Sequence, residues 1–473
     1  MSSIYFLGIG GTAMASVAVA LSHSGHAVSG SDTSLYPPMS TYLEMHNIRY
    51  FKGFSEKNIK RATPDLVVVG NAVSRGNCEL EFALEHRMEL ISMPELVRRE
   101  LIGRHTSMVV TGTHGKTTTT SLLAWLLDGG GLKPGFLVGG IPENFSLGCR
   151  ASGMGEQGFF VTEGDEYDTA FFDKRSKFML YRPDIAIINN IEFDHADIFD
   201  SLDAIRKSFR RFVNLIPRNG TLLVNGDDPV AGEVSANAFC PVERFGFGKN
   251  CEWSASDISC SGDMTTFTLL YRGTPLETLS VPLFGNHNVM NTLAAVAATR
   301  HAGVSMEGIA RTLPLFRRPK RRMEITGGLR SGITLIEDFA HHPTAIRATL
   351  DAIAALYKGR RIVACFEPRS NTTTRNIFQK ELARCFGPAA VVVMGKVHRP
   401  ERYRPEEQLD TGVLSKELQE QGKTVFLAGT GNQAYPGDIL DFLAETLRKD
   451  DVVILMSNGS FSNLKSLFLD NFG

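Results

Sequence analysis

The sequence predicts an α/β protein built from three successive domains. Apolar runs of strand length alternate with helix-compatible stretches along most of the chain, as in parallel sheets covered by helices. Two of these runs end in glycine-bearing loops, one near the N-terminus and one after residue 110. The length of 473 residues suits about three domains. We place their boundaries at residues 1–104, 105–317 and 318–473.

The first domain is predicted to open with a strand, a turn and a helix. Ile4–Leu7 is an apolar strand, Ala15–Leu21 a helix, and Ala27–Asp32 a second strand that ends in an acid. A further strand, Asp65–Val69, ends in a polar loop. Open α/β sheets bind ligands at the carboxyl ends of their strands. This pattern predicts a Rossmann-like domain with a ligand site at that edge.

The turn carries a nucleotide-binding signature. Gly8, Gly10 and Ala13 fit the fingerprint G-x-G-x-x-G/A, and Asp32 lies about 20 residues further on, where a ribose partner is expected. Taken alone, the pattern indicates an NAD-dependent oxidoreductase. Other nucleotide ligands use the same strand–turn–helix, so the choice of nucleotide stays open at this point.

The second domain opens with the most informative stretch of the chain. The apolar run Ser107–Val110 leads into Gly112-x-x-Gly115-Lys116-Thr117, and a helix-compatible stretch, Thr118–Leu127, follows. Backbone N–H groups of such a loop and the helix dipole favour phosphate. Lys116 is expected to reach the β- and γ-phosphates and Thr117 to place its hydroxyl on Mg²⁺. The motif is a shortened Walker pattern, because Val110 stands where the first glycine is usual.

This loop predicts a central domain of the P-loop ATPase type. Two later strands, Gly158–Thr162 and Asp184–Asn190, each lead into clustered acids, with Glu163 and Glu166 after the first and Asp194 before His195 after the second. Carboxylates at strand ends suit Mg²⁺ bound to nucleotide phosphates. A P-loop switch or regulatory ATPase that acts as a binding module is an alternative. The stretch Asn219–Ser280 is predicted to form a small β appendage.

The third domain repeats the alternation of strand and helix and is predicted to be Rossmann-like. Its expected strands are Ile333–Ile336, Arg361–Phe366, Ala389–Met394, Thr424–Ala428 and Asp451–Met456, and its expected helices are Thr344–Tyr357, Arg375–Phe386, Thr411–Gln421 and Asp438–Lys449.

Composition excludes several classes of protein. The net charge of −1 argues against a general nucleic-acid binder. Seven cysteines without paired C-x-x-C spacing suit reduced thiols in the cytoplasm. No apolar run reaches the ~18 residues that a membrane span needs. We expect a cytoplasmic protein, most simply a monomer, that binds neither nucleic acid nor membrane.

Taken together, the motifs resemble those of the Mur ligases, the ATP-dependent amide-forming enzymes of bacterial cell-wall synthesis, along essentially the whole chain. The resemblance rests on Gly8–Gly11, Thr111–Thr117, Glu163–Glu166, Asp194-His195, Gly285–Asn291, Lys320–Glu324 and Asp338–Pro343. Longer strings add detail within the family, namely Tyr36–Thr41, Tyr167–Phe178, Glu192–Phe199, Asp338–Ile346 and Glu367–Thr372.

The resemblance implies an activity. The carboxylate of UDP-N-acetylmuramate is expected to be joined, through an acyl phosphate, to the amine of L-alanyl-γ-D-glutamyl-meso-diaminopimelate, a murein tripeptide, in peptidoglycan recycling. L-alanine is the alternative amine. ATP and Mg²⁺ are the expected cofactors. The NAD-dependent oxidoreductase becomes the more remote alternative.

The resemblance also assigns residues. The UDP-sugar is expected at Gly8, Gly10, Gly11, Thr12, Met14, Asp32, Asn71 and Ser74. ATP is expected at Gly112, Thr113, His114, Gly115, Lys116, Thr117, Thr118, Asn291, Arg322 and Asp338, with Asn291 at the adenine and Asp338 at the ribose. Mg²⁺ is expected at Thr117, Glu163 and His195, and the catalytic residues are expected to be Lys116, His195 and Arg322.

The third domain is expected to bind the peptide. Arg369 and Asn371 are the candidates, since a guanidinium pairs well with a carboxylate. His341 and His342 are candidates for the base that deprotonates the amine, with structural hydrogen bonding as the alternative.

The sequence departs from the family pattern at two positions. Many Mur ligases carry a carbamylated lysine about fifteen residues after the magnesium histidine, and Arg210 stands there instead. A guanidinium cannot supply that carboxylate, so Glu166 is a possible substitute ligand. Gly164 replaces a common alanine, which we expect to be harmless.

Overall fold

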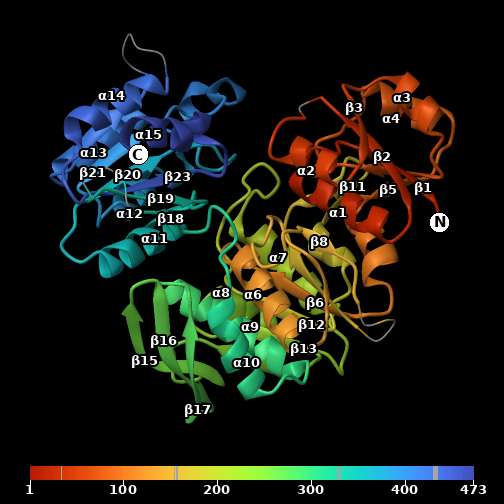
Figure 1. Cartoon of the computed structure of the whole chain (residues 1–473), viewed down its shortest axis with the longest axis horizontal. Helices are drawn as coiled ribbons and strands as arrows, with labels where there is room; N and C mark the ends of the chain where they lie inside the picture. The colour runs from red at the N-terminus through yellow and green to blue at the C-terminus, as the bar shows by residue number, and fades with distance from the viewer. Residues whose placement is uncertain (34, 154, 156–157, 328, 330–331, 430–434) are drawn as a thin grey trace.

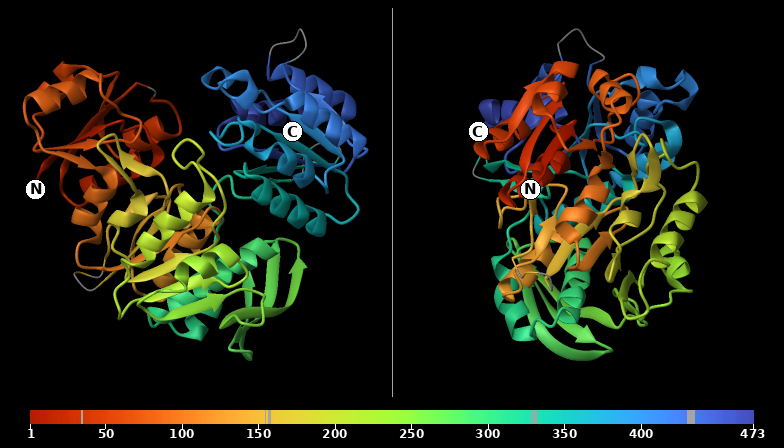
Figure 2. Two further views of the ribbon diagram at one scale, coloured as in Figure 1. Left: turned by 180° about the vertical axis from the view of Figure 1, so that it is seen from behind. Right: turned by 90° about the vertical axis from the view of Figure 1, so that its right-hand side faces the viewer.

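The computed structural model describes residues 1–33, 35–153, 155, 158–327, 329, 332–429 and 435–473. The chain forms three α/β units, coloured red to orange, yellow to green, and teal to blue in Figures 1 and 2. Each unit has its own sheet, with five, ten and six strands. The central unit touches both of the others (Figure 2). The predicted α/β class with three domains is confirmed at this level.

The N-terminal sheet is entirely parallel, in the order β3-β2-β1-β4-β5. Its two central strands, β1 (Ser3–Leu7) and β4 (Leu66–Val69), are almost wholly buried, because helices cover both faces. The other strands are β2 (Ala27–Asp32), β3 (Arg49–Lys52) and β5 (Leu90–Ser92). The helices are α1 (Thr12–His23), α2 (Met39–Met45), α3 (Glu56–Ala62), α4 (Cys78–Glu85), α5 (Met93–Leu96) and the π-helical η1 (Val97–Ile102).

The central sheet has the order β17-β16-β15-β14-β13-β12-β6-β9-β7-β8. Its strands are β6 (Thr106–Thr111), β7 (Gly135–Leu137), β8 (Cys149–Arg150), β9 (Phe159–Gly164), β12 (Ile185–Ile188), β13 (Thr221–Asn225), β14 (Val242–Phe245), β15 (Trp253–Ser261), β16 (Met264–Tyr271) and β17 (Thr274–Val281). Its helices are α6 (Lys116–Gly129), α7 (Leu202–Val213), α8 (Pro229–Ser235), α9 (Asn286–His301) and α10 (Met306–Thr312). A separate hairpin joins β10 (Asp168–Ala170) to β11 (Asp173–Ser176).

The predicted β appendage over Asn219–Ser280 is wrong in its first half. Strands β13 and β14 are parallel members of the main sheet, joined by the crossover helix α8, as parallel pairing requires. Within this stretch, as far as the structure describes it, only β15, β16 and β17 pair in antiparallel fashion and extend the sheet edge, as Figure 1 shows to the lower left of α9.

The C-terminal sheet has the order β18-β19-β23-β20-β21-β22, with only β18 antiparallel. Its strands are β18 (Glu324–Thr326), β19 (Thr334–Asp338), β20 (Ile362–Phe366), β21 (Val391–Met394), β22 (Thr424–Leu427) and β23 (Val452–Met456). Its helices are α11 (Pro343–Leu356), α12 (Gln379–Cys385), α13 (Thr411–Glu420), α14 (Gly437–Thr446) and α15 (Leu464–Phe472). The helix expected from Arg375 begins instead with a 3₁₀ turn, Asn376–Phe378.

The three units are packed together rather than strung on linkers. Buried side chains of α1 share one apolar cluster with Leu137, Cys149 and Phe178 of the central unit. Phe284 of the central unit is buried in the cluster of the C-terminal unit. Within the described part of the chain, no helix combines the length and the apolar character that spanning a bilayer requires.

Candidate active site

Two glycines shape the loop between β6 and α6. Gly112 has φ +131° and Gly115 has φ +83°, conformations that side chains rarely adopt. A Cβ on Gly112 would lie 3.0 Å from the backbone N and O of Asn190, and one on Gly115 would lie 2.4 Å from Oδ1 of Asn291. Backbone N–H groups of Thr113 and His114 donate to the O and Oδ1 of Asn190. The loop is therefore held from below by the chain that follows β12.

Strand order brings the acidic segments to this loop. Strands β9 and β12 flank β6 in register, so the acids that follow both strands arrive beside the phosphate loop. Nothing in the sequence fixes that order, because β7 and β8 come between β6 and β9 along the chain but lie beyond β9 in the sheet.

Lys116 is paired with a buried acid. Its Nζ donates to Oε2 of Glu166 at 2.8 Å and to the carbonyl of Gly112 at 2.5 Å. Burial opposes the ammonium charge, but Glu166 and Asp165 outweigh burial and raise the pKa of Lys116. The lysine is therefore firmly protonated, as a group that binds phosphate must be.

Two of the three predicted magnesium residues, Thr117 and Glu163, form a second chain of contacts with Arg322. Thr117 Oγ1 donates to Oε2 of Glu163 at 3.2 Å, and Arg322 Nη2 donates to Thr117 Oγ1 at 3.0 Å. The N–H of Gly139 donates to the other oxygen of Glu163 at 2.7 Å. Burial raises the pKa of Glu163 and lowers that of Arg322. Arg322 belongs to the C-terminal unit, so the site spans two units.

His195 lies with a different pair of acids. The ligand atoms of Asp165, Glu166 and His195 lie within 4.8 Å of one another. Burial disfavours the Asp165 carboxylate, yet Lys177, whose Nζ lies 2.9 Å away, and Lys116 hold its pKa well below the usual range. The two carboxylates of this cluster fit Mg²⁺, which prefers oxygen ligands. Glu166, the predicted substitute ligand, is part of this cluster.

Arg210 lies away from this cluster. It sits on α7 and pairs with Glu233 of α8 on the surface. The position that is a carbamylated lysine in many relatives therefore contributes no group to the acids around Lys116.

Asn291 and Asp338 make structural contacts. Asn291 Oδ1 accepts a hydrogen bond from Thr119 at 3.2 Å, and its Nδ2 donates to Asn288. These bonds place the amide under the phosphate loop. Asp338 accepts from the N–H of Met323 at 2.7 Å and of Ala340 at 2.9 Å. Through Met323, the Asp338 carboxylate fixes the backbone that carries Arg322.

The residues predicted to bind the UDP-sugar surround the edge of the N-terminal sheet. A cavity of about 340 Å³ is lined by Gly8, Asp32, Thr33, Phe54, Ala72, Val73, Ser74, Arg75, Gly76 and Asn77. Oδ2 of Asp32 accepts a hydrogen bond from the N–H of Gly10 at 2.9 Å. One carboxylate oxygen thus holds the glycine turn. Gly11, Thr12 and Met14 lie at the start of α1, and Asn71 follows β4.

The two peptide candidates differ in their surroundings. Asn371 Nδ2 donates to Oδ2 of Asp197, 2.8 Å away, on the loop after β12. Arg369 Nη1 contacts Glu367 at 3.4 Å within its own unit. Sequence reasoning missed Thr372, a buried residue whose Oγ1 donates to Oδ1 of Asp194 at 2.7 Å. Thr372 is the first of three consecutive threonines, and nothing in that run distinguishes the one that reaches Asp194.

Both candidate bases are engaged in hydrogen bonds. His341 Nδ1 lies 3.0 Å from the carbonyl of Phe339, and burial lowers its pKa. His342 caps α11, because its Nδ1 accepts from the N–H of Thr344. Burial, and then His114, lower the pKa of His342 to about 4. These contacts favour the structural alternative for both residues.

Comparison with known proteins covers the whole chain. Three family models match: "Mur ligase family, catalytic domain" over residues 3–104, "Mur ligase middle domain" over 110–299, and "Mur ligase, glutamate ligase domain" over 321–459.

Two curated relatives share the name UDP-N-acetylmuramate–L-alanyl-γ-D-glutamyl-meso-2,6-diaminoheptandioate ligase. The one from Haemophilus influenzae is 39% identical over 471 residues, which cover 99% of each chain. The one from Escherichia coli K12 is 38% identical, covering 99% of this chain and 97% of its own.

Solved structures agree with the sequence relatives. The crystal structure of a murein peptide ligase from Psychrobacter arcticus 273-4 has a TM-score of 0.73 and 33% identity, covering 100% of this chain and 98% of that one. A conserved length, three matching family models and full-length identity near 40% lead to one conclusion: this chain belongs to the Mur ligase family.

Proposed function

We propose that the chain is an ATP-dependent ligase that joins the carboxylate of UDP-N-acetylmuramate to the amine of L-alanyl-γ-D-glutamyl-meso-diaminopimelate. Membership of the Mur ligases supports amide formation, and the names of the two relatives support these substrates. The single observation that carries the proposal is the convergence of Lys116, Thr117 and Glu163 with Arg322 from another unit.

The residues suit phosphoryl transfer followed by amide formation. Mg²⁺–ATP, when bound, supplies the phosphoryl group, and Thr117, Glu163 and His195 are the proposed metal ligands. Lys116 and Arg322 supply positive charge where negative charge spreads in the transition state. The substrate carboxylate takes the γ-phosphoryl group and ADP leaves. The tripeptide amine then attacks the carbonyl of the acyl phosphate, phosphate leaves, and the amine loses a proton.

Lys116 must change partners for this chemistry. In the structure its ammonium is bound to Glu166. We propose that Glu166 holds Lys116 in place until phosphate oxygens arrive, because both partners are negatively charged. The Lys116 side chain is then already positioned before ATP binds, which lowers the entropic cost of binding.

The amine substrate is decided by a direct competition. Purified protein is given ATP, Mg²⁺ and UDP-N-acetylmuramate with the tripeptide, with L-alanine, or with both, and the product is weighed by mass spectrometry. We expect the UDP-muramoyl-tripeptide in the first and third mixtures. A product that contains only alanine in the third mixture would show that the substrate assignment is wrong.

The same mixtures test the regulatory ATPase alternative. A ligase releases phosphate only when acid and amine are both present. Phosphate release with ATP alone, at the rate of the full mixture, would favour a P-loop ATPase instead.

A further inference from the structure

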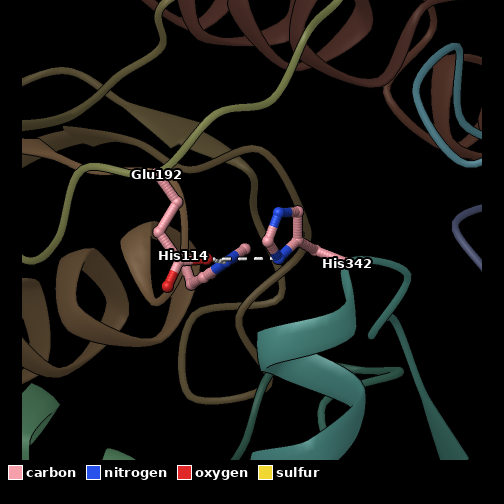
Figure 3. Close-up of side chains that lie close together, drawn as sticks. All are labelled: His114, Glu192 and His342. Carbon is pink, nitrogen blue, oxygen red and sulfur yellow. Dashed lines mark hydrogen bonds and ion pairs between the residues drawn. The ribbon is translucent and has the colours of Figure 1, made fainter. Parts of the chain in front are cut away.

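A histidine-rich cluster includes one residue of the phosphate loop, and its three side chains carry no chemical step of the proposed reaction. Figure 3 shows His114, Glu192 and His342 pointing toward one another from three segments. His114 belongs to the phosphate loop, Glu192 follows β12, and His342 precedes α11 of the C-terminal unit. Ligand atoms of all three lie within 4.8 Å of one another. The cluster therefore bridges two units of the chain.

The hydrogen bonds fix which nitrogen of His342 carries its proton. Nε2 lies 3.2 Å from the carbonyl of Phe193, which can only accept, so Nε2 is the donor. Nδ1 accepts from the N–H of Thr344 at 3.3 Å. Nδ1 of the neutral ring therefore carries its one lone pair, consistent with the lowered pKa of His342. The Thr344 contact that uses this lone pair is longer than a usual N–H hydrogen bond, and a bound ion would replace it.

That lone pair faces another acceptor. Nδ1 of His342 lies 3.2 Å from Oε2 of Glu192, and Nε2 of His114 lies 3.1 Å from the same oxygen. Burial disfavours the Glu192 carboxylate, but hydrogen bonding to His114 holds its pKa below the usual value. Nδ1 of His342 and the Glu192 oxygen are both acceptors, so a shared cation would stabilise their close contact.

The donor set indicates which cation. Two imidazole nitrogens and one carboxylate oxygen are borderline ligands that suit Zn²⁺ and similar transition metals, whereas Mg²⁺ prefers oxygen. The bond from His342 to Phe193 also fits, because a metal-bound histidine usually donates its other N–H to a carbonyl or carboxylate. The acids around His195 supply more oxygen and form a separate group.

We propose that His114, Glu192 and His342 form a binding site for a zinc-type transition-metal ion, which ties the phosphate loop to the C-terminal unit. Three protein ligands leave one tetrahedral position for water. A bound ion holds the start of α11 against the loop that precedes Lys116. Metal binding by the protein alone tests the site, so the test needs none of the proposed substrates.

The test is metal binding by the intact protein in the presence of excess Mg²⁺, which keeps the oxygen-rich acids occupied. Zn²⁺ is titrated by calorimetry, and Co²⁺ is followed by its visible absorption, which is intense for tetrahedral coordination. We expect one ion per chain and tetrahedral Co²⁺ bands. We also expect Zn²⁺ to slow tryptic cleavage of the segment near Lys320, which is exposed.

Three variants identify the ligands. His114→Ala and His342→Asn should each weaken Zn²⁺ binding by at least ~100-fold, since even the loss of a group that orients a ligand costs ~10–100-fold. Asparagine can still cap α11, so folding is protected. His301→Ala is the matched control, because His301 pairs with Glu243 elsewhere, and it should bind Zn²⁺ normally. Circular dichroism without metal confirms that each variant is folded.

Either of two results would overturn the proposal. Unchanged Zn²⁺ affinity and Co²⁺ spectra in both His114→Ala and His342→Asn would exclude the site. Loss of binding in His195→Ala, with both of those variants unaffected, would also exclude it and would place the ion at Asp165, Glu166 and His195.

Discussion

At the residue scale, the phosphate-loop lysine shows how a buried positive charge is stabilised by a buried carboxylate. Lys116 is mostly buried, with 13% of its side chain exposed, and an unpaired ammonium there would be costly. Glu166, only 2% exposed, stabilises it at 2.8 Å. Removing either partner alone leaves the other as an uncompensated buried charge. The pair is therefore a functional group and a structural one at once.

We predict that Lys116→Ala lowers ligase turnover by at least ~100-fold, because a group that neutralises transition-state charge is lost. The same change should also destabilise the fold by about 3–5 kcal/mol through unpaired Glu166. Steady-state product formation and urea unfolding measure the two effects.

The double variant Lys116→Ala/Glu166→Gln separates the effect on activity from the effect on stability, because it leaves no unpaired carboxylate at position 166. It should regain much of the stability and none of the activity. Recovery of turnover in the double variant would show that Lys116 acts only through folding.

The second prediction at this scale concerns pH. The pKa of His342 is lowered to about 4 by burial and by His114, whereas an unfolded histidine titrates near ~6.5. The unfolded chain thus binds the extra proton first, and the contribution of His342 to stability is complete above pH ~6.5 and is lost as the pH falls toward about 4.

His342→Asn keeps an N-cap and cannot titrate. We expect its melting temperature to fall less steeply than that of the parent between pH ~6.5 and about 4. His301→Asn, at the separate pair with Glu243, should keep the parent slope. Parallel curves for the parent and His342→Asn would refute the assignment.

At the element scale, close packing of neighbouring strands decides single positions. Gly164 ends β9 beside Thr111 of β6. A Cβ there would lie 2.5 Å from Cγ2 of Thr111 and 2.7 Å from Cγ1 of Val109. Gly164 stands where alanine is common in the family, and we expected this difference to be harmless. The neighbouring side chains leave no room for a Cβ at this position.

We predict that Gly164→Ala destabilises the protein by about 1–3 kcal/mol through overpacking. Gly232→Ala is the matched control, because it lies within α8 and its new Cβ would meet nothing within 4 Å. That change should stabilise by about 0.5–1 kcal/mol, since alanine favours helix. Urea unfolding of both variants measures the difference, and equal effects would refute the packing argument.

At the scale of the whole molecule, a few polar contacts seat the C-terminal unit on the central one. Arg322 reaches Thr117, His342 reaches Phe193, and Thr372 reaches Asp194. The loop after β12 makes two of these three contacts. Motion of this loop and of the C-terminal unit is therefore coupled, as expected of a site assembled from two units.

We predict that Thr372→Val weakens the contact between the C-terminal unit and the central unit. Its hydroxyl bonds a buried carboxylate, and such a bond contributes about 1.5–3 kcal/mol. An arrangement in which the C-terminal unit has moved away from the central unit should be populated at least ~10-fold more often. Trypsin should therefore cut faster near Lys320. SDS gels would show fragments divided at that segment.

Thr373→Val is the control for this prediction. Its hydroxyl is equally buried but bonds Ser370 in the same unit. Its cleavage rate should stay within about twofold of the parent. Equal acceleration in both variants would mean that local loosening, not the contact between units, exposes the cleavage site.

The sequence by itself determined the α/β class, the three-part order and the phosphate loop. These are local properties, because strand and helix follow from apolar periodicity and the loop from glycines beside Lys116. It also determined the family resemblance, which the comparisons confirm. The sequence predicted that the acids after β9 and β12 form one group. It did not predict which residue each acid contacts.

Only the tertiary structure decided those partners. Strand order places β9 and β12 on either side of β6, and packing between units brings Arg322 to Thr117 and Thr372 to Asp194. It also extended the main sheet through β13 and β14, where a separate appendage was expected. The physical reason is that these contacts join residues far apart in the chain, and their geometry is set by how whole elements pack rather than by any local pattern.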